Sequence, residues 1–145
     1  MSNHQINQAV RDGVTRAVAV VALAGVALIH VLDAPGSFQD APYKGWLYVG
    51  LIAGCLGAAA ALVRSSDLRA WAAAATFPAG AIVAFLISRT VGLPQGADDI
   101  GNWTEPLGLS SLFVEGTLIA LAAAVIHERL GFLTSRSRAH ALVAA

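Results

Sequence analysis

The sequence is short of charged residues and of the side chains that redox and soft-metal chemistry need. Only 12% of its 145 residues are charged, well below the ~25% of soluble domains, while 57% are hydrophobic. Its single cysteine, Cys55, excludes an intramolecular disulfide and a CxxC redox pair. The one methionine is the initiator, which leaves no Met-rich or Cys-rich copper site. The few charges are dispersed and sum to zero, so no basic tract indicates nucleic acid as a partner.

Motifs for catalysis are also missing. The chain has no Ser-His-Asp arrangement, no HExxH and no Gly-rich phosphate loop. Haem ligation by paired imidazoles needs two histidines at one depth, whereas His30 is expected near the outer side of the membrane and His127 near the inner side. We therefore expect no catalytic residues, and a membrane enzyme is the least supported class.

What the sequence does contain is four long apolar runs, each close to the ~20 residues that cross ~30 Å of hydrocarbon. They are Ala17–Leu32, Gly45–Val63, Ala70–Ser88 and Leu107–Ile126. Because four spans and short tails use the whole length, residues 1–145 are predicted to form one all-α domain, a four-helix transmembrane bundle in a lipid bilayer. The first run lacks a clean small-x-small cleavage site, which favours an uncleaved span over a signal peptide.

The arginines predict the orientation. Most basic residues fall in the two tails and in the connection between the second and third runs: Arg11, Arg16, Arg64, Arg69, Arg129, Arg136 and Arg138. Short arginine-rich segments stay in the cytoplasm, so both termini are expected inside and the segments 34–44 and 90–106 are expected to be outer loops. The bias toward Arg over Lys, with abundant Ala and Gly, indicates a bacterial cytoplasmic membrane.

The two halves of the chain share a layout. Each has an apolar run, a Gly/Pro loop with acids and a second apolar run, so the fold also fits two repeated helical hairpins. Gly50, Gly54 and Gly57 form a small-residue stripe on the second run, which predicts a helix-packing surface. The stripe would contact either a neighbouring helix of the same chain or a second protomer.

Ionisable residues within or beside these runs predict an outward-facing polar pocket. A charge at membrane depth costs at least ~2.5–3.5 kcal/mol, so His30, Arg89 and Glu115 require a structural or functional reason. Asp33 follows His30 by one turn, and Glu105 precedes the last run, so all five are candidate pocket residues. Glu115 is expected either to pair with Arg89 or to form a proton, metal or ligand site. A metal site built from His30, Asp33 and Glu115 is a further alternative.

Three functions remain open at this point. The pocket could bind a small ligand, an ion or a lipid headgroup, or dock a partner protein. The chain could act as a proton- or ion-coupled small transporter, working as a homo-oligomer. It could also be an accessory subunit or assembly factor of a membrane complex, which would account for its small size.

Three segments carry a resemblance. They are the string from His30 to Pro35, the string Ser88-Arg89-Thr90-Val91-Gly92-Leu93-Pro94, and Glu105-Pro106-Leu107-Gly108 leading to Val114-Glu115. The chain resembles, over about residues 17–128, uncharacterised small four-span integral membrane proteins of actinobacterial type. The resemblance implies the four-span fold and an actinobacterial source, and it carries no catalytic role or cofactor.

Overall fold

A computed structural model describes the backbone of residues 2–143 and the side chains of residues 2–132. Four α-helices follow one another along the chain, with a single 3₁₀ turn before the last: α1 (Asn3–Asp40), α2 (Pro42–Arg64), α3 (Leu68–Thr90), η1 (Ala97–Asp99) and α4 (Pro106–Val143). Each of the four predicted apolar runs lies within one helix, and each of these helices is long and apolar enough to cross a membrane. The all-α fold with four such helices is therefore confirmed.

The first predicted outer loop is wrong. Residues 34–40 continue α1, Pro35 lies inside that helix, and Ala41 alone separates α1 from α2. A proline within a helix removes one backbone hydrogen bond but leaves the rest of the ladder intact, so it does not have to end the helix. Pro42 stands at the start of α2, where the missing N–H has no partner to lose. Asp67 starts α3 by accepting a hydrogen bond from the backbone N–H of Ala70.

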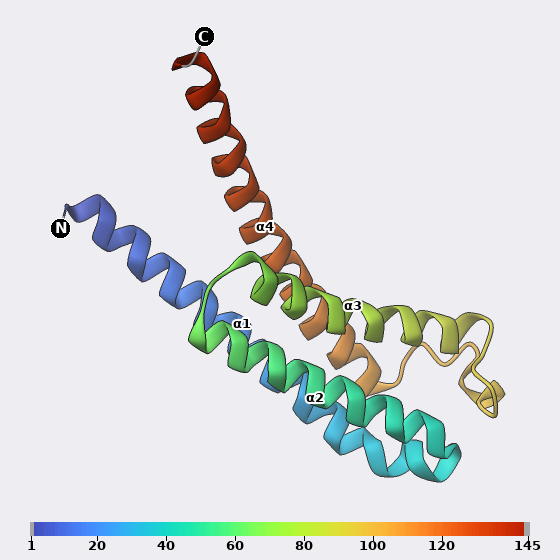
Figure 1. The fold of residues 1–145 in the computed structure, drawn as a ribbon. Helices are drawn as coiled ribbons and strands as arrows, with labels where there is room; N and C mark the ends of the chain where they lie inside the picture. Colours follow the sequence, from blue (N-terminus) through green and yellow to red (C-terminus); the bar gives the residue numbers. More distant parts are fainter. Residues whose placement is uncertain (1, 144–145) are drawn as a thin grey trace.

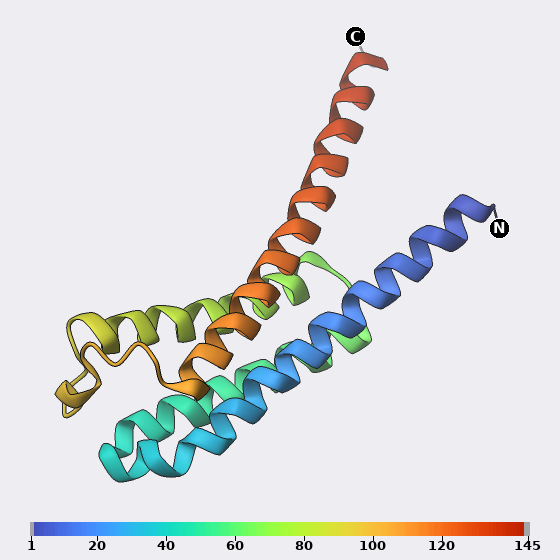
Figure 2. The same cartoon turned by 180° about the vertical axis from the view of Figure 1, so that it is seen from behind.

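The connections alternate between the two ends of the bundle (Figure 1). Both termini and the α2–α3 turn lie at one end, and the α1–α2 turn and the connection 91–105 lie at the other. The ends of α1 and α4 that carry the termini project beyond the α2–α3 turn, which Figure 2 shows from behind. α1 packs against α2 and α4, and α3 packs against the same two helices, so α2 and α4 occupy diagonal positions.

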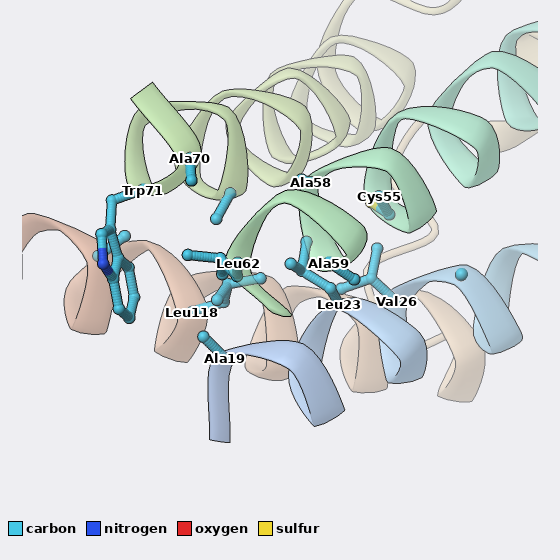
Figure 3. Close-up of a cluster of buried hydrophobic side chains, with 13 residues drawn as sticks. Ala19, Leu23, Val26, Cys55, Ala58, Ala59, Leu62, Ala70, Trp71 and Leu118 are labelled. Atoms are coloured by element: carbon cyan, nitrogen blue, oxygen red, sulfur yellow. The ribbon is translucent and has the colours of Figure 1, made fainter. Parts of the chain in front are cut away.

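The apolar core occupies the half of the bundle near the termini. Figure 3 shows its side chains pointing between the helices, with Leu23, Leu62, Trp71 and Leu118 fully buried. Ion pairs brace the same end. Arg11 contacts Glu128 at 2.5 Å, which joins α1 to α4. The opposite half contains few of these core residues and is described below.

The predicted small-residue stripe is only partly a packing surface within this chain. A Cβ added at Gly54 would lie 2.4 Å from the ring of Phe77, so α2 approaches α3 closely there. A Cβ at Gly50 or Gly57 would meet nothing within 4 Å. Gly54 therefore packs within this chain, and a contact of Gly50 and Gly57 with a second protomer stays a prediction.

Candidate functional site: a polar cavity between the helices

The buried polar side chains gather in the half of the bundle away from the termini. Among the residues with described side chains, seven polar or charged ones are buried: His30, Ser37, Lys44, Ser88, Arg89, Ser111 and Glu115. All seven line one cavity of about 590 Å³, to which all four helices and the connection 91–105 contribute. Asp33 and Glu105 line the same cavity, so it brings together the five pocket residues that were predicted from the sequence.

Arg89 does not pair with Glu115, and that predicted ion pair is wrong. Its guanidinium donates to Asp99 Oδ1 at 2.7 Å and to Glu105 Oε2 at 2.5 Å, and its carbon Cζ lies 4.8 Å from the ring centre of Phe85. The reason is the path of the chain after α3. The connection 91–105 folds back over the end of this helix and supplies two nearer carboxylates. Glu115 lies about 15 Å beyond Glu105 along α4, at ~1.5 Å per residue.

Turns with left-handed backbone make that folding back possible. Gly92 has φ 81° and Gly101 has φ 79°, values that favour glycine. The Gly101 N–H then donates to the backbone carbonyl of Arg89 at 2.9 Å, so main chain and side chain of the same arginine both hold the connection. On the α2 side, the Tyr43 hydroxyl donates to the carbonyl of Pro94 at 2.6 Å. The connection thus forms an ordered cover over one part of the cavity.

Asp99 is the electrostatic centre of this cover. It accepts a hydrogen bond from Lys44 Nζ at 3.1 Å as well as the one from Arg89. Partial burial acts to raise the pKa of Asp99, but the hydrogen bonds and positive charges of Lys44 and Arg89 outweigh it, and the pKa falls below its usual value of 3.8. Asp99 is therefore ionised at neutral pH and joins α2, α3 and η1.

Glu115 lies deeper, on α4, and is 1% exposed. Its Oε1 accepts a hydrogen bond from the Ser111 hydroxyl, one turn earlier, at 2.8 Å. His30 Nε2, on α1, is 3.9 Å from the same oxygen, which is beyond hydrogen-bond distance. The other ring nitrogen of His30, Nδ1, bonds to the carbonyl of Val26 at 2.9 Å.

Asp33 occupies the same wall of the cavity as His30. Its Oδ2 accepts a hydrogen bond from the Tyr48 hydroxyl at 2.9 Å, and the Tyr48 ring meets the His30 ring edge to face with centroids 4.8 Å apart. Asp33, His30 and Glu115 do not converge on one point. Within the part of the chain that the structure describes, no three His, Cys, Asp or Glu side chains are placed to hold a metal ion.

Sequence reasoning missed several residues of this site, among them Lys44, Tyr48 and Asp99. Lys44 is the only lysine, but its segment was predicted to be a loop, and a loop has no defined face. It lies in the first turn of α2 instead, where it is buried against the cover. Asp98 and Asp99 are adjacent in the sequence, and the sequence alone does not indicate which of them contacts Lys44 and Arg89. The fold of the connection places Asp99 there.

Comparisons with family models, with curated proteins and with solved structures find no match to this chain.

Proposed function

We propose that this chain is a non-enzymatic membrane protein that binds a small ligand in the cavity between its helices. One observation carries the proposal: the seven polar side chains that are buried among residues 2–132 all line a single cavity. Burying a polar or charged group is costly unless it is paired, and a bundle that needed only stability could fill this space with apolar side chains. The cavity volume, about 590 Å³, falls in the range of ~300–1,000 Å³ that is typical of ligand sites.

The cavity opens on the outer side of a bacterial cytoplasmic membrane in this proposal, with both termini in the cytoplasm. The arginine-rich tails and the α2–α3 turn share one end of the bundle, and the acidic connection 91–105 lies at the other. Since arginine-rich ends stay inside, the cavity half faces out. The homo-oligomer and accessory-subunit hypotheses remain predictions, because no structural observation favours either.

Native mass spectrometry tests the binding function on protein extracted gently from the producing cells. The test variant is Gly80→Leu, because Gly80 lines the cavity and an added Cβ there meets no neighbour within 4 Å. The matched control is Gly116→Leu, on α4, where an added Cβ also meets nothing but which lines neither cavity. We expect an additional bound mass on the wild type and on Gly116→Leu, and its loss in Gly80→Leu.

A bare wild-type chain, or an additional mass that Gly80→Leu retains, would overturn the proposal. The control matters because both variants add the same apolar side chain to a helix, so any general effect on folding or on detergent binding appears in both. A mass that is lost in Gly80→Leu alone has to occupy the cavity.

A second candidate function, proton- or ion-coupled transport, is favoured by a second cavity at the opposite end. This cavity measures about 580 Å³ and is lined by charged groups of α1 and α4 together with the start of α3. The apolar core lies between the two cavities. A carrier that opens to one side of the membrane at a time would need such a barrier between its two access sites. Substrate-dependent proton flux into liposomes tests the idea. If Glu115→Gln leaves that flux intact, a carrier coupled through Glu115 is excluded.

A further inference from the structure

The Glu115 carboxylate is the least exposed polar group that lines the cavity, and it accepts few hydrogen bonds. Within the described part of the chain, only the Ser111 hydroxyl donates to it, at Oε1. Among the residues whose side chains the structure describes, none donates to its other oxygen, Oε2. A carboxylate that is 1% exposed normally accepts several hydrogen bonds, so this one lacks donors.

Beside the two oxygens of Glu115, the His30 ring presents a third acceptor, Nε2, rather than a donor. A carbonyl can only accept, so the bond to Val26 places the ring hydrogen on Nδ1. In the neutral ring, Nε2 then presents a lone pair toward Glu115. An imidazolium bonded directly to a carboxylate would lie at ~2.7–2.9 Å, whereas the separation here is 3.9 Å. The two residues face each other across a gap in which a donor is missing.

The space between His30 Nε2 and Glu115 Oε1 is wide enough for one donor group that bonds to both atoms. A nitrogen that donates to two acceptors at ~2.8 Å each can stand between atoms 3.9 Å apart. The surrounding charge favours a cation, because five acidic side chains line the cavity and only two basic ones do. Both bases, Lys44 and Arg89, are held by the carboxylates of the cover. Neither base contacts Glu115 or Asp33.

The rest of the lining is mostly apolar and partly aromatic. Leu51, Phe77, Ala81 and Phe85 contribute to it. Such walls bury an organic body, and aromatic faces attract a cation. An inorganic ion has no three-ligand group to hold it in the described part of the chain.

We propose that the cavity binds an organic ammonium ion whose N–H groups bridge Glu115 and His30 while its apolar body fills the space along α2 and α3. This inference rests on the proposed binding function and names its ligand class. The ammonium can belong to a free amine or to an aminophospholipid headgroup, since both present the same N–H donors. Charge, donor hydrogens and an apolar body are all required.

Three probes of similar size separate these requirements. 4-Phenylbutylamine carries charge and N–H donors, its trimethylated ammonium analogue carries charge without donors, and 4-phenylbutan-1-ol is neutral. Each is titrated calorimetrically into wild-type protein in phosphatidylcholine nanodiscs, with empty nanodiscs as the blank. We expect the amine to bind at least about tenfold more tightly than the other two, as the loss of a charge-assisted hydrogen bond implies.

Variants then locate the contact. Glu115→Gln should weaken amine binding at least about tenfold and leave the alcohol unchanged. The control Asp98→Asn removes an exposed carboxylate of the same half of the molecule that does not line the cavity, and it should bind like the wild type. Phosphatidylethanolamine added to the nanodiscs identifies the source. Competition with the amine indicates a lipid headgroup, and its absence indicates a free amine.

Equal affinity for the alcohol and the amine would overturn the ammonium assignment while leaving a ligand cavity in place. Binding of no probe would overturn it as well, and the mass-spectrometric comparison of Gly80→Leu with Gly116→Leu then decides the binding function independently. The three-probe comparison uses the wild type alone, so the inference is tested even if Glu115→Gln fails to fold.

Discussion

Replacing Arg89 with alanine should detach the connection 91–105 from the end of α3. Arg89 is 6% exposed and holds the carboxylates of Asp99 and Glu105 with one guanidinium, at 2.7 and 2.5 Å. The alanine variant keeps the backbone contact from Gly101 but loses both ion pairs and the packing of the guanidinium on Phe85. Glu105 then loses its ion pair, whereas Asp99 keeps the one with Lys44.

The size of the loss follows from how far water can reach those carboxylates. Removing one member of a fully buried pair costs ~3–5 kcal/mol. The Asp99 and Glu105 side chains are 33% and 31% exposed, so solvent offsets part of that cost. We expect the free energy of unfolding to fall by about 2 kcal/mol, toward the lower end for charged hydrogen bonds. Arg89→Lys keeps the charge but not the two-pronged geometry, and it should lose about half as much.

The assay is denaturant unfolding in mixed micelles, followed by circular dichroism for the helices and by tryptophan fluorescence for the connection, which carries Trp103. The matched control is Arg64→Ala, because Arg64 is exposed at the opposite end of the bundle and forms no ion pair with the described side chains. The account requires Arg89→Ala to be clearly less stable than Arg64→Ala. Equal stability of the two variants would refute the role assigned to Arg89.

Two further predictions concern Asp99 and the helix contact. Because the pKa of Asp99 is lowered on folding, its contribution to stability is fully present above its usual pKa of 3.8 and is lost as the pH falls through the folded value. The stability difference between wild type and Asp99→Asn should therefore shrink in acid, and a constant difference from pH 7 to pH 3 would contradict this. Gly54→Ala should lower the free energy of unfolding by ~1–3 kcal/mol, because its Cβ overlaps the Phe77 ring. Gly57→Ala, with no neighbour, should be neutral or stabilising by up to ~1 kcal/mol, and equal effects at the two glycines would be the contrary result.

The helices could be predicted from the sequence because hydrophobic length alone determines them. Their ends could not, as α1 shows. Pro35 and the glycine that follows it are local breakers, yet the helix continues to Asp40 because packing against α2 compensates for one missing hydrogen bond. Pro42 behaves as expected from the sequence, because proline favours the first turn of a helix and α2 begins at this residue.

The candidate site could also be predicted only in part: its residues could be selected from the sequence, but their contacts could not. His30, Glu115 and Arg89 could be selected because ionisable groups beside apolar runs are expensive, and they line one cavity. Their partners could not be predicted, because partners depend on the path of the connection 91–105. That path needs a left-handed residue at Gln95, φ 61°, a position with no glycine to indicate it. Whether the cavity binds a ligand remains a prediction.

The most direct test of an outward-facing ligand cavity is the chemical accessibility of a single cysteine in intact cells. With the native thiol removed by Cys55→Ala, Ser88→Cys places a thiol in the cavity lining, and Ser66→Cys places one in the α2–α3 turn as the control. The account predicts that a cationic, membrane-impermeant methanethiosulfonate modifies Ser88→Cys from outside, that 4-phenylbutylamine slows this reaction, and that Ser66→Cys reacts only after permeabilisation. Modification of Ser66→Cys in intact cells, with Ser88→Cys protected until the cells are opened, would contradict it.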